Sequence, residues 1–282
     1  NPLLPEIYQV IEPLIHDGPQ ELLVEINQQG NKIVWQIINR NPSNKILTYS
    51  GVNIKPILDY IHLKSISTLA VDNISKMESI NNSPLYQSFA KSLANRYNTA
   101  LVTIIDELDG MIALSFQLDD NWLLLASAHQ EQTISDIAIA SLAKLQPQTI
   151  NKTLPDNTRY TELVANPDIV EKEEINTKNG KIITLQTSNG EFSFHYYLEG
   201  GFIILSNDIN TLQENRSLNS TYQYTCNNEK NIQSILYLDI ADWTKDQKDN
   251  ELNLNFNEIS KFEAYSQGSD ENIVITGCLE LK

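Results

Sequence analysis

Residues 181–208 read KIITLQTSNGEFSFHYYLEGGFIILSND, and this stretch decides the fold class. Three apolar runs are separated by Asn189-Gly190 and by Gly200-Gly201, and Asn-Gly is a strong hairpin signal. The pattern predicts three antiparallel strands in succession, with positive φ at both Asn189 and Gly190. Asp208 follows the last run in the position of an N-cap residue, and it predicts a short helix through Leu212.

Similar patterns occur along the rest of the chain. Residues 21–28, 32–39 and 45–50 predict a second three-strand meander, which is followed by a helix from Asn53. A hairpin is expected over 111–118 and 122–128, and then a helix whose capping pair is Thr133 and Asp136. Pro147 and Pro155 predict a linker, and residues 213–231 predict irregular structure. Further strands are expected at 67–72, 234–240, 258–267 and 272–281.

The two meanders indicate an internal duplication. Residues 28–30 align with 188–190, an offset of 188 − 28 = 160, and the strands and helix that follow keep the same order. On this interpretation residues 1–66 are the later part of a first unit. Residues 67–233 form a complete unit with a helical insertion at 83–146, and residues 234–282 are C-terminal strands packed with that unit. We therefore expect the natural chain to continue upstream of residue 1.

The composition excludes several classes of protein. With 41% hydrophobic and 20% charged residues, the chain is globular and not mainly disordered. Thirty-six acidic residues against 20 basic ones give a net charge of −16, which opposes binding to nucleic acid or to an anionic membrane surface. No apolar run approaches the roughly 18 residues that a membrane-spanning helix needs.

Cys226 and Cys278 are the two cysteines of the chain. Two cysteines form neither a disulfide framework nor a zinc site. They could form one bridge that closes a loop of about 51 residues, worth roughly 4 kcal/mol in the chain-entropy description. The sequence leaves both this bridge and a pair of free thiols open.

The sequence contains no recognisable catalytic motif. There is no Gly-x-Ser-x-Gly elbow, no His-Glu-x-x-His pair and no phosphate-binding glycine loop. The four histidines are His16, His62, His129 and His195, and no two of them have the spacing of metal ligands on one helix or strand. We therefore expect no catalytic residue, no metal site and no cofactor.

An acidic segment near the C-terminus is the candidate interaction site. Asp239, Asp242 and Asp246 surround Trp243, and a tryptophan in a polar loop has less core to fill than one in a strand. The alternative is that Trp243 packs back onto the last strands. The spacing of the acids does not match a calcium-binding loop.

The order of elements in the second half of the chain resembles a family of uncharacterised, membrane-anchored exported bacterial proteins. The matching features are Asp109-Gly110 after a helix, the hairpin over 111–128, a second helix, Leu154-Pro155 before TELV at 161–164, and GGFIILSND at 200–208. The resemblance covers about residues 67–282 and includes no catalytic motif. It implies an α+β extracytoplasmic portion behind an N-terminal membrane anchor, without any known activity.

We therefore expect an α+β protein made of antiparallel β-meanders, with helices packed on one face and an internal duplication. The expected function is that of a non-enzymatic, extracytoplasmic structural or protein-interaction module within a larger assembly. Its partner would be a protein with a relatively basic surface, and a membrane would be reached only through a segment absent from this chain. The alternative is a carrier that binds a lipid or other apolar ligand between sheet and helices. A hydrolase with an unrecognised site is the third hypothesis.

Overall fold

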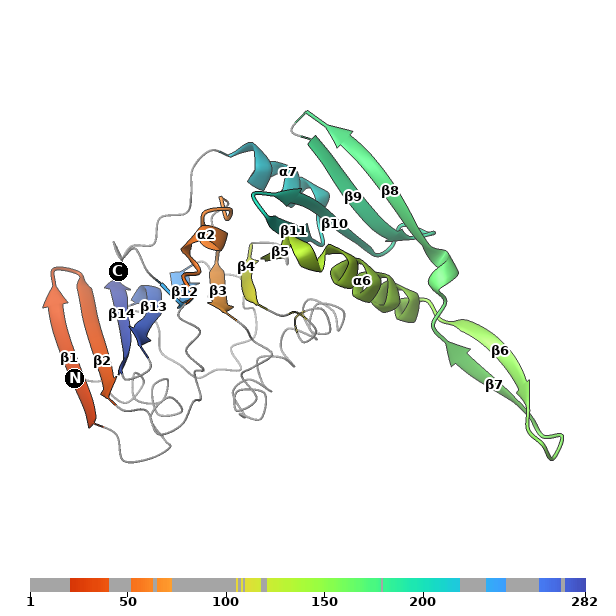
Figure 1. The fold of residues 1–282 in the computed structure, drawn as a ribbon, viewed down its shortest axis with the longest axis horizontal. Coiled ribbons are helices and arrows are strands. Elements are labelled where there is room, and N and C mark those ends of the chain that lie inside the picture. Colours follow the sequence, from red (N-terminus) through yellow and green to blue (C-terminus); the bar gives the residue numbers. More distant parts are fainter. Residues whose placement is uncertain are drawn as a thin grey trace. The chain divides into compact units, whose positions relative to one another are not determined.

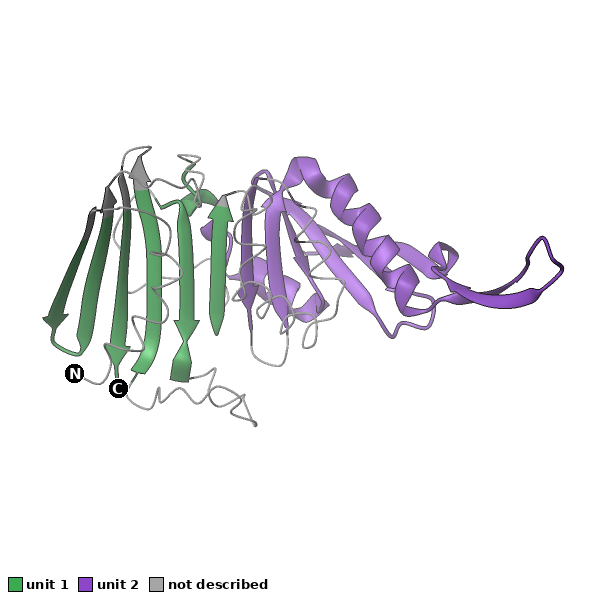
Figure 2. Ribbon diagram, turned by 90° about the horizontal axis from the view of Figure 1, so that it is seen from below, with its two compact units in different colours: residues 1–56, 65–72, 223–282 green, residues 57–64, 73–222 purple. Residues whose placement is uncertain are grey.

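The computed structural model describes residues 21–40, 52–62, 65–72, 105, 108, 110–117, 121–178, 180–218, 232–241, 259–269 and 272–282. The chain divides into two compact units, coloured separately in Figure 2. Unit 1 comprises residues 1–56, 65–72 and 223–282, and unit 2 comprises residues 57–64 and 73–222. This division differs from the expected one, because residues 21–40 and 234–282 belong to the same unit.

Unit 1 is built on an antiparallel sheet. Its described strands are β1 (Glu21–Gln29), β2 (Lys32–Arg40), β3 (Ser67–Asp72), β12 (Ser234–Asp239), β13 (Ile259–Ser269) and β14 (Asn272–Leu281). They are arranged in the order β1-β2-β14-β13-β12-β3 (Figure 1). A short helix, α2 (Lys55–Leu58), lies between β2 and β3 along the chain.

One face of the unit 1 sheet carries an apolar cluster. Trp35 and Ile37 of β2 are buried there with Phe262, Ala264 and Ile275 packed against them. These residues share a face because side chains alternate along each strand and the strands are in register.

Cys278 is buried in the unit 1 sheet and is disulfide-bonded. The sequence left two possibilities open, a bridge between Cys226 and Cys278 or a pair of free thiols. Because Cys226 is the only other cysteine of the chain, the structure contains the bridge. Cys226 itself lies outside the described residues.

Unit 2 is also built on antiparallel strands in a sheet arrangement, with two longer helices. Its described strands are β4 (Met111–Phe116), β5 (Trp122–Ser127), β8 (Val170–Thr177), β9 (Gly180–Thr187), β10 (Ser193–Glu199) and β11 (Phe202–Ser206), in the order β4-β5-β11-β10-β9-β8. The helices are α6 (Glu131–Leu145) and α7 (Ile209–Ser217), and the short 3₁₀ turns are η2 (Ala128–Gln130) and η3 (Pro167–Ile169). A separate hairpin pairs β6 (Gln148–Thr153) with β7 (Arg159–Val164).

The two helices of unit 2 lie on opposite faces of its sheet. Successive residues of a strand point to opposite faces. Tyr196 donates a hydrogen bond to Glu131 of α6 at 3.2 Å, whereas the next residue, Tyr197, accepts one from Asn215 of α7 at 3.2 Å. The expectation that the helices pack on one face is therefore not confirmed in this unit. The sheet is apolar on both faces, as in strand β5, where residues 122–126 are all buried, so each face needs a cover.

All three strands expected around residues 181–208 are present, as β9, β10 and β11, but the first turn differs from the prediction. Gly190 has φ of 69°, as expected, whereas Asn189 does not have positive φ. The Asn189 side chain accepts a hydrogen bond from the Glu191 amide at 3.1 Å, and Thr187 N–H pairs with Phe192 O across a longer loop. The tight two-residue turn is instead Gly200-Gly201, where both φ values are positive.

Several other expectations need correction. Helix α6 begins at Glu131, before the predicted capping residue Thr133. Asp208 does cap α7, accepting a hydrogen bond from the Thr211 amide at 2.7 Å, but the helix continues to Ser217. The position beside β2 that the predicted first meander assigns to residues 45–50 is occupied by β14. Residues 45–50 lie outside the described residues. So does most of the part of the predicted insertion (83–146) that precedes β4.

Replacing Gly190 by Val is expected to lower the free energy of unfolding by about 1–2 kcal/mol, because a β-branched residue resists positive φ. An added Cβ meets nothing within 4 Å, so backbone strain is the expected cause. Gly190→Asn is the matched control, since asparagine tolerates this region, and its loss should be smaller. Equal losses for the two variants in denaturant unfolding would contradict this explanation.

Candidate protein-interaction site

The hairpin formed by β6 and β7, here called the arm, is the candidate interaction site. It spans residues 148–164 and forms a two-stranded sheet that is separate from the other six described strands of unit 2. Figure 1 shows the arm after the C-terminal end of α6. An isolated two-stranded hairpin buries little surface of its own, so the arm presents both of its faces to solvent.

The base of the arm is held by hydrogen bonds within unit 2. The Asn166 amide donates to Ala143 O, near the end of α6, at 3.0 Å. After η3, the backbone amide and the hydroxyl of Ser188 both donate to Ile169 O at 2.8 Å. The arm is therefore tied at its base to α6 on one side and to the β9–β10 loop on the other.

The tip of the arm is a turn encoded by Pro155-Asp156-Asn157. Asn157 has φ of 66°, which asparagine tolerates, and its amide donates to Leu154 O at 2.9 Å. The Asp156 carboxylate accepts a hydrogen bond from the Thr158 amide at 2.9 Å. The hydrogen bonds from Thr158 hold the pKa of Asp156 below its ordinary value, so this carboxylate stays ionised at the tip.

The two faces of the arm differ in chemistry. One face carries Ile150, Tyr160 and Val164 together with the ion pair between Lys152 Nζ and Glu162 Oε2 at 2.5 Å. The hydrogen bond to Glu162 and its charge hold the pKa of Lys152 above its ordinary value. The other face is rich in threonine, and its exposed apolar side chain is Leu163.

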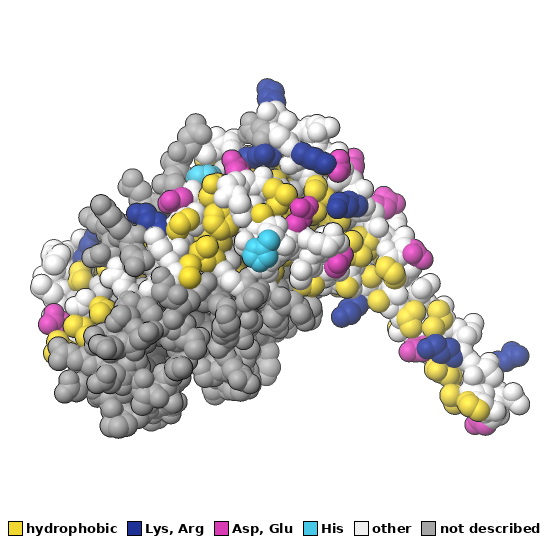
Figure 3. All heavy atoms as spheres, in the orientation of Figure 1, with side chains coloured by type: hydrophobic (Ala, Val, Ile, Leu, Met, Phe, Trp, Pro, Cys, Tyr) yellow, Lys and Arg dark blue, Asp and Glu magenta, His cyan; other side chains and the backbone are white. Residues whose placement is uncertain are grey.

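Apolar side chains of the arm are exposed in an otherwise acidic chain. Leu163 is 67% exposed, and Leu154 and Tyr160 are also exposed. Figure 3 shows hydrophobic side chains along the arm between those of both charge signs. Lys152 and Arg159 balance Asp156 and Glu162, so the arm has a net charge of 2 − 2 = 0, whereas the whole chain carries −16. An exposed, neutral ribbon of this kind is suited to contact another protein.

The acidic candidate site is only partly described. Asp239 is the last residue of β12 and is 3% exposed, so it is not available as a surface contact. It lies opposite Lys261 in the sheet register, and its amide donates to Ile66 O at 2.7 Å. Asp242, Trp243 and Asp246 lie outside the described residues.

His195 contacts two hydroxyl groups inside unit 2. Its Nδ1 lies 2.9 Å from Thr184 Oγ1, and its Nε2 lies 3.0 Å from Ser193 Oγ. A serine–histidine–acid triad needs a carboxylate on the ring nitrogen that faces away from the serine, and here a threonine hydroxyl takes that place. His195 is therefore not arranged as the base of such a triad. Among the described residues, no group of three or more His, Cys, Asp or Glu side chains is placed to hold a metal ion.

The burial of His195 predicts a pH dependence of stability. Burial lowers its pKa from 6.5, although the charge of Asp208 acts in the opposite direction. As the pH falls, the His195 imidazole is therefore protonated at a higher pH in the unfolded chain than in the folded chain. Below pH 6.5 the unfolded chain thus binds more protons than the folded chain does. Stability should be fully present above about pH 6.5 and fall with decreasing pH until the folded-state pKa is reached, with a slope of at most about 1.4 kcal/mol per pH unit.

Denaturant unfolding at several pH values between about 7.5 and 5 measures this effect. His195→Gln retains a polar side chain and should show a weaker dependence than the wild-type chain over this range. His129→Gln is the control, because His129 is exposed, and it should leave the dependence unchanged. An identical dependence in His195→Gln and wild type would show that His195 does not cause it.

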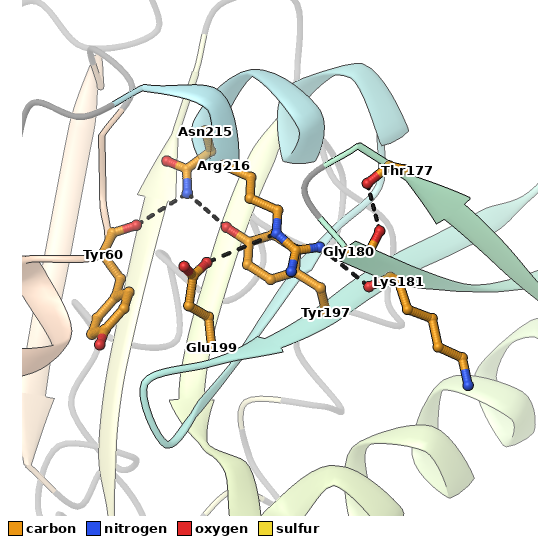
Figure 4. A network of polar contacts seen from close by, with 8 residues as sticks. All are labelled: Tyr60, Thr177, Gly180, Lys181, Tyr197, Glu199, Asn215 and Arg216. Carbon is orange, nitrogen blue, oxygen red and sulfur yellow. Dashed lines mark hydrogen bonds and ion pairs between the residues drawn. The ribbon is translucent and has the colours of Figure 1, made fainter.

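A buried polar network links α7 to β10 and to the segment before β3, as Figure 4 shows. The Asn215 amide group accepts a hydrogen bond from His62 N–H at 2.9 Å and donates to Tyr60 O at 3.0 Å and to Tyr197 Oη at 3.2 Å. Burial raises the pKa of Tyr197 to about 12, so its phenol stays neutral. The Arg216 guanidinium lies 4.5 Å from the centre of the Tyr197 ring. Because its groups bond to one another, we interpret this network as structural.

Comparisons with protein-family models, with curated proteins and with solved structures find no match for this chain. The class of protein is therefore defined by the fold alone, as an α+β protein dominated by antiparallel sheet. No helix among the described residues has both the length and the apolar character needed to cross a membrane.

The sequence interpretation missed the arm. Pro147 and Pro155 suggested a linker, but Pro147 precedes the first arm strand and Pro155 lies in the turn at its tip. The available signal was the pair of threonine-containing segments, TINKT and RYTELV, on either side of Pro-Asp-Asn. The short polar strands have no continuous apolar alternation, so this signal is weak.

Proposed function

We propose that this protein is a non-enzymatic protein-interaction module and that the arm is its binding element. The observation that carries this proposal is a neutral ribbon with exposed apolar side chains, tied at its base to α6. A partner whose apolar groove encloses both faces of the arm would cover Leu154, Tyr160 and Leu163. Basic residues around that groove would be attracted by the net charge of −16 and would accelerate association at low salt.

The proposed compartment is extracytoplasmic. The disulfide at Cys278 supports this location, because structural disulfides persist mainly in oxidising compartments. The resemblance to exported bacterial proteins supports the same location and adds attachment to a membrane. Fractionation of the native source, with labelling of free thiols, tests the location. A cytoplasmic protein with two reducible thiols would contradict it.

Site-specific photocrosslinking tests the role of the arm. A photoreactive residue at Leu163 should capture a protein that the same residue at Glu173, an exposed position on β8, does not capture. The partner identified by mass spectrometry is then bound to purified Tyr160→Ser/Leu163→Ser protein, and we expect about a 10-fold or greater loss of affinity. No residue of the arm is buried, so the double variant should keep its unfolding midpoint. Unchanged affinity in a folded variant would refute this role.

We also propose an internal duplication, in an alignment different from the one that the turns suggest. Counted in chain order within each unit, the described strands of both sheets are arranged 1-2-6-5-4-3, with antiparallel neighbours throughout. This alignment matches β1 and β2 with β4 and β5, and it matches the final three strands of each unit. Helices α2 and α6 then occupy corresponding places, between the second and third strands. An experimental structure with a different strand order in either unit would contradict the duplication.

A further inference from the structure

Strand β1 lies at an edge of the unit 1 sheet. It pairs with β2 along its whole length, and no described strand pairs with its other side. The backbone N–H and C=O groups on that side are therefore open to a further strand. Such an edge binds an extended segment when the neighbouring side chains are apolar and become buried in the contact.

The outward backbone groups at the centre of β1 belong to apolar residues. Gly30 has φ of 64° and Asn31 does not have positive φ, so the two-residue β1–β2 turn fits type II′, and Gln29 and Lys32 form a hydrogen-bonded pair. Because hydrogen-bonded pairs alternate along antiparallel strands, Val24 and Ile26 direct their N–H and C=O groups away from β2.

The side chains of Val24 and Ile26 extend the apolar cluster of unit 1 to the open edge. Val24 lies opposite Ile37, and Ile26 lies opposite Trp35, so all four side chains are on one face of the sheet. Ile37 and Trp35 are buried, whereas Val24 and Ile26 are each 50% exposed. The apolar face thus ends in two half-exposed side chains at a strand with unpaired backbone.

The outer strand of the unit 2 sheet has the opposite character. Strand β8 pairs with β9 on one side, and no described strand pairs with the other. It carries four consecutive exposed charges, Glu171, Lys172, Glu173 and Glu174. Charges of this kind discourage the addition of a strand. On β1, Glu25 is the single charge between residues 23 and 29.

We propose that two copies of this chain associate through β1, with the two strands antiparallel about a two-fold axis at Val24. In this register Val24 of one copy lies opposite Val24 of the other, and Glu25 lies opposite Leu23. Moving the axis to Glu25 would place two glutamates directly opposite each other, which is unfavourable. The apolar match of the strand with itself is the reason to prefer a second copy over a strand from another protein.

The net charge gives this association a diagnostic salt dependence. Two chains of charge −16 repel each other at low ionic strength, and salt screens this repulsion. Dimer formation should therefore strengthen as salt is added. A basic partner protein bound at the same edge would show the opposite trend, because screening would weaken its attraction.

Analytical ultracentrifugation of the full chain tests the proposal at ~0.05 M and ~1 M salt, where the Debye length is about 14 Å and 3 Å. We expect a dimer whose dissociation constant is lower at high salt. Val24→Pro removes an outward N–H without removing a bond to β2, and Ile26→Lys places a charge on the edge. Each should weaken the dimer by about 10-fold or more, whereas Leu198→Lys, at an exposed position on β10, should not.

Cross-linking then tests the register. A cysteine introduced at Val24 should join two copies through a short bis-maleimide, whereas one introduced at Leu198 should not. Circular dichroism and the unfolding midpoint establish that each variant is folded. A monomer at both salt concentrations would overturn the proposal. So would a dimer that weakens with salt, or one that persists unchanged in folded Val24→Pro and Ile26→Lys proteins.

Discussion

Loss of the disulfide at Cys278 is expected to lower the free energy of unfolding by roughly 4 kcal/mol. The bridge to Cys226 closes a loop of about 51 residues, which restricts the unfolded chain and so disfavours it. The chain between these cysteines contains β12 and β13, so the loop encloses the centre of the unit 1 sheet. A loss of this size is a large fraction of the stability of an ordinary domain.

The measurement compares denaturant unfolding of the wild-type chain with Cys278→Ala and with Cys226→Ser/Cys278→Ala. Cys278 is buried, so a reductant attacks the folded protein slowly, and substitution is a cleaner test than reduction. The single and double variants should be about equally destabilised, and neither should respond to a reductant. A loss below about 1 kcal/mol would show that the bridge constrains the unfolded chain little.

Replacing Asn215 by Leu is the second change with a large expected effect. Leucine has the same number and branching of side-chain heavy atoms as asparagine but no polar atoms, so three groups lose their hydrogen bond to residue 215: His62 N–H, Tyr60 O and the Tyr197 hydroxyl. A lost hydrogen bond costs up to about 1–3 kcal/mol where the group is buried and less where it is half-buried, as at Tyr60 and His62, so we expect a total loss of about 3–4 kcal/mol.

Two variants separate this effect from a general weakening of α7. Asn215→Asp keeps an acceptor for His62 N–H but removes the donors to Tyr60 O and Tyr197. It also places a carboxylate at the buried position. Asn210→Leu changes an exposed asparagine of the same helix and should alter stability by less than about 0.5 kcal/mol. If Asn210→Leu and Asn215→Leu had equal effects in denaturant unfolding, the network would not be the cause.

The arm and the edge strand β1 suggest two separate contacts for one protein. The arm is neutral and anchored, and we assign it to a partner protein, whereas the edge of β1 matches a second copy. The two proposals fail independently, because the arm variants change Tyr160 and Leu163 and the edge variants change Val24 and Ile26. A dimer with two arms would also bind a multivalent partner more tightly than a monomer does.

Local signals in the sequence predicted individual elements well. Alternating apolar residues indicated the hairpin β1–β2, two apolar runs indicated the hairpin β4–β5, and Asp208 indicated the start of α7, because each depends on residues close together in the chain. The same local reasoning failed at Asn189-Gly190, where a side-chain hydrogen bond to Glu191 selects a longer loop. It also failed at the arm, whose short polar strands have no continuous apolar face.

The sequence by itself therefore determined the antiparallel α+β class, the chain's acidity and the possibility of one disulfide. Only the tertiary structure decided that β14 lies beside β2, that α6 and α7 cover opposite faces, and that Asp239 is buried. The physical reason is that strand order and burial depend on contacts between residues far apart in the chain, such as β2 with β14. Periodicity shows that a strand has an apolar face, but not which strand or helix covers it.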